Sequence, residues 1–199
     1  GTRYIDFLVP GLIALNIMMA CMWGMSWTII ERRKGNMLRR MIVTPVNRQN
    51  ILLGLMAARI TMNFVEAALL MLFAWIYFDI QIQGSLPALI MVFVAGNIAF
   101  TGIAVITSSR TSNTEVGNGI INFVNMPMMI LSGIFFSYHN FPEWSIPFIQ
   151  NLPLTLLADS MRSIINEGAG VAAVLDKTLI MSLIGIVTFG LGLKMFKWY

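Results

Sequence analysis

Long apolar runs alternate with short polar stretches along this chain of 199 residues. A helix needs about 20 apolar residues to cross the roughly 30 Å hydrocarbon core of a bilayer, and five runs approach that length. None of the runs alternates in the strand pattern, and lipid does not tolerate unpaired backbone groups, so each run is expected to be a helix. The predicted membrane spans are Phe7–Ile30, Ile51–Phe78, Leu86–Thr107, Val116–Ser137 and residues 178–196.

The basic residues gather between the first two spans. The loop Glu31–Arg48 holds six of the 13 Lys and Arg residues of the chain. Loops rich in Lys and Arg stay on the cytoplasmic side of the membrane, so this loop is predicted to face the cytoplasm.

The other connections fit the same topology. Asp79–Ser85 has an acid and no base, Ser108–Glu115 is short and holds Arg110, and Tyr138–Lys177 is mainly acidic. Five spans with the N-terminus outside and the C-terminus in the cytoplasm satisfy every loop. An odd number of spans starting outside, without a signal sequence, indicates a further span upstream of this sequence.

Composition narrows the class of protein. The chain is 57% hydrophobic and only 11% charged, whereas soluble domains carry about 25% charged residues. An ordinary soluble fold is therefore excluded, and a single all-α transmembrane domain is expected over residues 1–199. The formal net charge of +4 reflects membrane topology and indicates no nucleic-acid partner.

The cytoplasmic loop is predicted to contain a short amphipathic helix. Apolar residues recur at helical spacing, with arginines on the other side, at Met37, Leu38, Met41 and Ile42. Thr44 and Pro45 then have the residue types of an N-cap and a first helical turn, so a new helix is predicted to start there. The loop could be a basic anchor on anionic headgroups, at roughly 1 kcal/mol per Lys or Arg. It could also be a lever that docks in a soluble partner.

The outer segment, residues 138–168, is rich in proline and aromatic residues. Its apolar stretches are too short and too often broken by proline to cross a membrane. We expect two short helices that dip into the outer leaflet as a re-entrant hairpin, with aromatic residues at the interface. Leu154–Glu167 is expected to be the second helix, with an Asp159–Arg162 pair on its surface and Gly168 at its end.

Two sets of polar residues lie inside the predicted spans. Glu66 is an ionisable residue at membrane depth, which indicates either a functional proton or substrate site or a structural pair with a neighbouring helix or protomer. Arg59 lies two turns away on the same helical face, too far for a direct bond to Glu66. Asn118, Asn122, Asn125 and Ser132 form a stripe that indicates either interhelical hydrogen bonds or a polar translocation path.

Enzymatic motifs are not found in the sequence. His139 has no second His or Cys at ligand spacing, so no metal site is expected. No Ser-centred nucleophile elbow or zinc-protease motif occurs either. No catalytic residue is therefore assigned.

Two blocks of this sequence resemble the membrane subunit of type-2 ABC exporters. The first is YIDFLVPGLIA followed by ERRKGNMLRRMIVTPVNRQNILLG, and the second is LSGIFFSYHNFPEW followed by LPLTLLADSMRSIINEG. Leu156 departs from the family pattern, in which a polar or aromatic residue is frequent. The matching positions of the second block are Ser132, Gly133, Pro142, Pro153, Leu154, Thr155 and Arg162.

The resemblance implies a six-span subunit whose first span is absent here, placed in a cell inner membrane and paired with a second permease subunit. Glu31–Val43 would be the coupling helix that inserts into a cytoplasmic ATPase subunit. The chain has no Gly-x-x-x-x-Gly-Lys-Ser/Thr loop, so ATP and Mg²⁺ would be bound by that separate subunit. The coupling residues would be Glu31, Arg33, Gly35, Leu38, Arg39, Arg40, Met41, Thr44 and Pro45.

The same resemblance places a translocation path between two protomers, near Glu66 and the Asn stripe. The outer hairpin would shape an outer gate that includes Pro142, Trp144, Pro153, Asp159 and Arg162. Two alternatives are an ion-coupled secondary transporter that uses Glu66, and a membrane scaffold without transport. No internal repeat of the kind common in secondary transporters is visible.

Overall fold

The computed structural model describes residues 3–198 of the chain, and within that range the helices are joined by turns and loops, with no strand. This confirms the expected all-α membrane fold. The helices are α1 (Tyr4–Lys34), α2 (Met37–Ile42), α3 (Arg48–Phe78), α4 (Leu86–Thr107), α5 (Thr114–Leu131), α6 (Ile146–Gln150), α7 (Pro153–Glu167) and α8 (Val171–Met195), with 3-10 turns at Tyr138–Asn140 and Glu143–Ser145.

Four helices of the described part are long and apolar enough to cross a membrane: α1, α3, α4 and α8. Two of the predicted spans agree closely with α3 and α4. The last span was predicted to start at residue 178, but α8 begins at Val171, so Asp176 and Lys177 lie within the helix. The prediction placed the start after Asp176 and Lys177 because they end the apolar run, but the helix continues through both residues.

The fourth predicted span also differs from the structure. α5 ends at Leu131, whereas Val116–Ser137 was expected. Gly133 has a φ of 72°, a left-handed conformation that glycine adopts readily and that turns the chain away from the helix axis. With 18 residues, α5 is roughly 27 Å long, and it is not one of the four helices that are long and apolar enough to cross a membrane.

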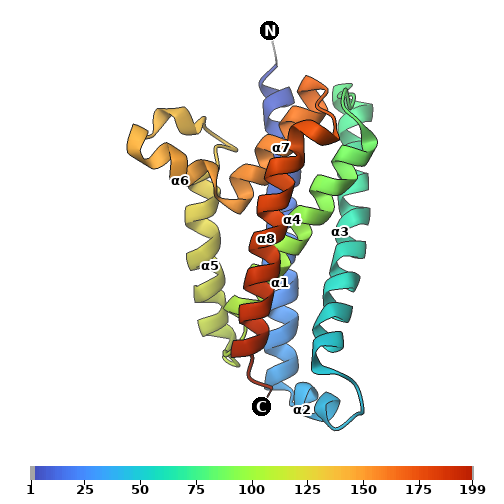
Figure 1. Cartoon of the computed structure of the whole chain (residues 1–199), viewed down its shortest axis with the longest axis vertical. Coiled ribbons are helices and arrows are strands. Elements are labelled where there is room, and N and C mark those ends of the chain that lie inside the picture. The colour runs from blue at the N-terminus through green and yellow to red at the C-terminus, as the bar shows by residue number, and fades with distance from the viewer. Residues whose placement is uncertain (1–2, 199) are drawn as a thin grey trace.

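The helices form an elongated bundle around α1 (Figure 1). α3 stands on one side of the bundle and α5 on the other. α6 and α7 lie at the end that holds the N-terminus, while α2 and the C-terminus lie at the opposite end. The loop Glu31–Arg48 and the outer hairpin are therefore at opposite ends, as the charge pattern predicts.

The closest helix pair is α4 with α8. Glycines on both helices allow the two backbones to meet, as is common between membrane helices. A Cβ placed on Gly185 would lie 2.6 Å from Ile98 Cγ2, and one placed on Gly192 would lie 2.8 Å from Val105 Cγ1. α4 and α8 are therefore expected to move as one unit.

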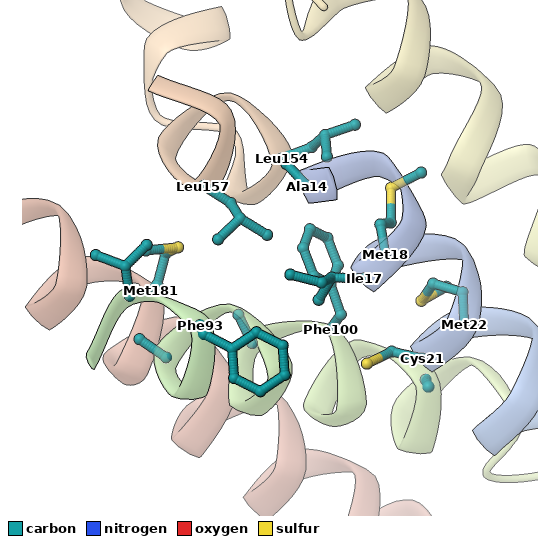
Figure 2. Packing of buried hydrophobic residues seen from close by; sticks show 14 of the residues in the cluster. Ala14, Ile17, Met18, Cys21, Met22, Phe93, Phe100, Leu154, Leu157 and Met181 are labelled. Carbon is teal, nitrogen blue, oxygen red and sulfur yellow. The ribbon is translucent and has the colours of Figure 1, made fainter. Parts of the chain in front are cut away.

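The core lies where α1, α4, α7 and α8 meet (Figure 2). Figure 2 shows side chains from all four helices in one cluster, among them Ile17, Phe100, Leu157 and Met181. Large apolar side chains also cover the outer faces: Leu69 of α3 is 62% exposed, and Ile186 of α8 is 65% exposed. An apolar exterior of this kind suits a protein whose solvent is lipid.

Candidate functional site

The loop between α1 and α3 is shaped differently from the single coupling helix that the resemblance implies over Glu31–Val43. α1 continues to Lys34, and the chain then turns at Gly35 and Asn36 before α2 begins at Met37. Asn36 has a φ of 57°, in the left-handed region that asparagine tolerates better than most residues. The extent implied for the coupling helix was therefore wrong, because the turn at Gly35–Asn36 separates the last turn of α1 from a short α2. The short amphipathic helix predicted from Met37, Leu38, Met41 and Ile42 is confirmed as α2.

The start of the next helix was also placed wrongly. Thr44 and Pro45 lie in a bend, and α3 begins at Arg48 after Asn47. The Thr44 hydroxyl donates back to the Met41 carbonyl oxygen at 2.5 Å. Thr44 therefore closes the end of α2 instead of starting α3, a use of threonine that the local sequence pattern does not distinguish.

α2 presents a basic and partly apolar surface at the end of the molecule. Leu38 is fully buried and holds α2 against the core, while Arg39 and Arg40 are exposed. Met37 is 49% exposed and Val43 is 87% exposed. We call the exposed residues of this surface the docking face: Glu31, Gly35, Met37, Arg39, Arg40, Val43, Thr44 and Pro45. Met41 is half-buried beneath it.

Arg33 does not lie on the docking face, although the sequence reading grouped it with the coupling residues. Its side chain is only 6% exposed, and it points into the protein, where it donates hydrogen bonds to backbone carbonyl oxygens. Helical spacing alone does not reveal this burial, because the partners come from parts of the chain far away in sequence.

A polar cluster lies within the bundle between α1, α3 and α4. Asn63 Nδ2 donates to Asn97 Oδ1 at 2.6 Å and to Cys21 Sγ at 3.1 Å, and Thr101 Oγ1 lies 3.7 Å from the same sulfur. All four side chains are buried. The sequence reading missed this cluster, although Asn63 and Asn97 are polar residues inside apolar spans.

Two of the three charged residues of α3, Arg59 and Glu66, lie close to this cluster along the same helix. The Arg59 guanidinium packs against Gly24 of α1, and its buried Nε has no hydrogen-bond partner. Glu66 is half-buried. Within residues 3–198 the ion pairs are Arg3–Asp6 and Asp159–Arg162, so the expected absence of an Arg59–Glu66 bond agrees with the structure, and a pair between Glu66 and another protomer stays a prediction.

The Asn stripe of α5 is divided between two faces. Asn125 is buried against α1, with Nδ2 3.7 Å from Met19 Sδ, whereas Asn122 is exposed. Asn118 is half-buried, and its Oδ1 has no partner. Ser132 is buried and bonds to the Met129 carbonyl oxygen at 2.9 Å. The four residues therefore do not form one continuous polar path within this chain.

The outer segment folds as the predicted pair of short helices, α6 and α7. Pro153 starts α7, and Gly168 ends it with a φ of 71°. The predicted ion pair between Asp159 and Arg162 is also confirmed, because Arg162 Nη1 lies 3.3 Å from Asp159 Oδ1. Burial raises the pKa of the Asp159 carboxyl, and the positive charges of Lys177 and Arg162 oppose this rise.

Arg162 also joins three parts of the outer end. It donates to the carbonyl oxygens of Phe7 and Gly133, each at 3.1 Å, and its guanidinium lies 3.9 Å from the centre of the Phe7 ring. Pro153 and Asp159 share α7 with it. Pro142 and Trp144 are instead exposed on the rim, Trp144 at 83%, so the predicted gate residues fall into an anchored group and an exposed group.

An apolar cavity of about 780 Å³ lies between α3, α4 and the loop that joins them. Its walls include Phe64, Trp75, Leu86 and Phe93, and Met161 of α7 reaches it. Gln81 is its one polar side chain within the described residues. Trp75 and Leu86 are both more than half exposed, so the cavity opens on the apolar exterior.

Comparison with known proteins identifies a family for most of the chain. Residues 1–166 match the family model described as ABC-2 type transporter. The chain is 25% identical over 172 residues to ABC transporter G family member 20 of Dictyostelium discoideum, an alignment that covers 85% of this chain and 23% of that protein.

Two bacterial proteins are similarly related. The probable multidrug ABC transporter permease YbhR of Escherichia coli is 28% identical, over 73% of this chain and 39% of that protein. The linearmycin resistance permease protein LnrN of Bacillus subtilis is 24% identical, over 88% of this chain and 46% of that protein. The chain therefore spans less than half the length of the relatives it matches.

Proposed function

Because the chain belongs to the ABC-2 type transporter family, we propose that it is the transmembrane part of an ATP-driven exporter. In this proposal a cytoplasmic ATPase subunit, which binds ATP and Mg²⁺, docks on α2, and two copies of the membrane part enclose the translocation path. The chain itself carries out no hydrolysis. The docking face lies in the cytoplasm, and the outer hairpin lies on the other side of a bacterial inner membrane.

The observation that carries this proposal is the position of α2. It sits at the end of the bundle, joined directly to the long helices α1 and α3 (Figure 1). Leu38 fixes it to the core while Arg39 and Arg40 remain exposed. A short element that is anchored on one face and basic on the other suits transmission of a push from a soluble partner better than simple attachment to headgroups.

The path is proposed to run along α5 and α1 of two protomers. α5 places Asn122 and Phe123 on its exposed side and Asn125 on its α1 side. The outer hairpin would close this path from outside, with Arg162 holding α7 to the ends of α1 and α5. The names of the bacterial relatives, a multidrug and a linearmycin resistance permease, support an apolar or amphipathic cargo.

Charge reversal on the docking face tests the proposal. Arg39→Glu combined with Arg40→Glu should abolish co-purification of the ATPase subunit in mild detergent, and with it the ATPase activity of the preparation. The reason is that like charges across a docking interface are strongly unfavourable. The measurement is the stoichiometry of the co-purifying subunit together with its rate of ATP hydrolysis.

The matched control is Arg110→Glu combined with Lys194→Glu. This variant changes the charge by the same amount at the same end of the molecule, with both residues exposed but outside the docking face. It should keep the subunit and its activity. Wild-type protein that purifies without any ATPase would contradict the exporter proposal and favour an ion-coupled transporter, with Glu66→Gln as the next variant to measure.

A further inference from the structure

Arg33 is the best-bonded charged side chain of the cytoplasmic end. Its Nε donates to the Lys197 carbonyl oxygen at 2.9 Å, its Nη1 to that of Ser108 at 2.6 Å, and its Nη2 to that of Ser109 at 2.9 Å. Nη1 also donates to the carbonyl oxygen of Thr111. Four carbonyl oxygens from two distant segments therefore surround one guanidinium.

The partners explain why a charge is tolerated at a buried position. Ser108 caps the C-terminal end of α4, where the helix dipole places partial negative charge that favours a cation. The Arg33 guanidinium also lies 4.8 Å from the centre of the Phe196 ring, a favourable cation–π distance. No carboxylate of the described chain pairs with Arg33, so the carbonyl oxygens and the ring provide its stabilisation.

The tail after α8 completes this arrangement. The Lys197 backbone N–H donates to the Ser109 carbonyl oxygen at 2.8 Å, and the rings of Phe196 and Trp198 contact each other at a tilt of 54°, with centres 4.6 Å apart. Arg48, the first residue of α3, lies 6.0 Å from the centre of the Trp198 ring. The tail thus contacts both ends of the loop that carries α2: Arg33 before it and Arg48 after it.

We propose that Arg33 is a positioning residue that transmits movement of α2 to the α4–α8 pair. It lies two residues before the turn at Gly35, so a displacement of α2 acts on it directly. Its bonds reach the end of α4 and the tail of α8, and the close backbone approach at Gly185 and Gly192 packs those two helices tightly, so we expect them to move together. Without this connection, a push on α2 would act mainly on α1 and α3.

This inference rests on the proposed function, because it assumes that an ATPase subunit moves α2. It is separate from docking, since Arg33 is buried and cannot contact that subunit. Substitution of Arg33 should therefore leave assembly and ATP hydrolysis in place while the nucleotide no longer changes the position of α8. If Arg33 had a merely structural role, its substitution would either impair assembly, ATP hydrolysis and the movement of α8 together or leave all three unchanged.

The test uses the purified complex with its ATPase subunit and a spin label at Leu183→Cys, a position of α8 that is 63% exposed. Distances between the labels of two protomers are measured without nucleotide and after trapping with ATP and vanadate. Wild type should show a nucleotide-dependent shift between two distances. In Arg33→Gln the nucleotide-induced change in the ratio of the two distance populations should be roughly tenfold smaller, within the usual range of coupling between sites. Lys34→Gln should behave as wild type.

A second pair of variants guards against a folding defect in Arg33→Gln. Lys197→Pro removes the backbone N–H that bonds to Ser109, and the extended conformation of Phe196 suits a residue before proline. Lys197→Ala removes the exposed side chain and keeps that N–H. Loss of the shift in Lys197→Pro but not in Lys197→Ala would support the proposal.

The outcomes separate the two proposals. A wild-type complex with no ATPase subunit and no nucleotide-dependent shift would overturn the proposed function and this inference with it. A wild-type shift that persists in full in both Arg33→Gln and Lys197→Pro would overturn this inference alone. In that case the movement passes from α2 through α1 and α3.

Discussion

At the scale of single residues, the polar side chains of this protein are anchored mainly by backbone carbonyl oxygens. Arg33 has this role at one end of the bundle and Arg162 at the other. An arginine suits it because its planar guanidinium carries five donors in fixed directions. Each arginine links helices that are distant in sequence and short of other polar contacts, so each is expected to matter more for stability than an exposed basic residue.

Arg162→Ala should destabilise the outer end. The change removes the bonds to Phe7 and Gly133 and leaves those carbonyl oxygens with one partner fewer, at a cost of about 1–3 kcal/mol. Arg162→Lys should be intermediate, because lysine keeps the charge without the planar fork. The apparent Tm in detergent measures the effect, and Trp144→Ala on the exposed rim is the control. Equal Tm values for Arg162→Ala and Trp144→Ala would contradict the anchoring role.

Asn63→Ala should loosen α3 from the bundle. Asn63 is the one polar residue among the four buried residues of α3, and hydrogen bonds between membrane helices contribute about 0.6 kcal/mol on average. Cys21, the single cysteine of the chain, is fully buried beside it. A membrane-permeant maleimide should therefore label Cys21 faster in Asn63→Ala than in wild type, whereas Asn122→Ala should not change the rate. An unchanged rate in Asn63→Ala would mean that apolar packing alone holds α3.

At the scale of elements, apolar runs predicted the interiors of the helices and failed at their ends. The uncharged apolar run predicted at Leu86–Thr107 has the same bounds as α4. The end of α1 was missed because the apolar run ends at Ile30, whereas the helix continues through the charged residues up to Lys34. Burial of Arg33 depends on Ser108 and Lys197, which lie far along the chain, so no local pattern could predict it.

Gly185→Val tests whether α4 and α8 form one unit. The new side chain would overlap Ile98 of α4, and overpacking of this kind typically costs about 1–3 kcal/mol. Gly190→Val is the matched control on the same helix, because nothing lies within 4 Å of a Cβ there. The apparent Tm should fall for Gly185→Val and stay near wild type for Gly190→Val. A similar fall in both variants would show that valine perturbs α8 in itself and not its contact with α4.

At the scale of the whole molecule, the exposed faces differ in kind. The outward faces of α3 and α8 are mainly apolar near their middles, as lipid requires, for example at Leu69 and Ile186. The exposed Thr61 hydroxyl of α3 donates to the Ala57 carbonyl oxygen of its own helix. α5 differs, because Asn122 is exposed between Phe123 and other apolar residues. A polar side chain that faces lipid is costly, so this face of α5 is the one that a second protomer is expected to cover.

Cysteine cross-linking tests whether a second protomer covers this face of α5. In a two-fold symmetric dimer a residue close to the axis meets its own copy, so Phe123→Cys, placed in a Cys21→Ala background, should form a disulfide between protomers on mild oxidation in membranes. Ile186→Cys in the same background is the control, because it is similarly exposed but lies on α8. Rapid cross-linking of Phe123→Cys alone would place the protomer contact on α5 and leave Asn122 shielded from lipid. Equal, slow cross-linking of both variants would mean that α5 faces lipid, and the proposed path between protomers would then have to follow another helix.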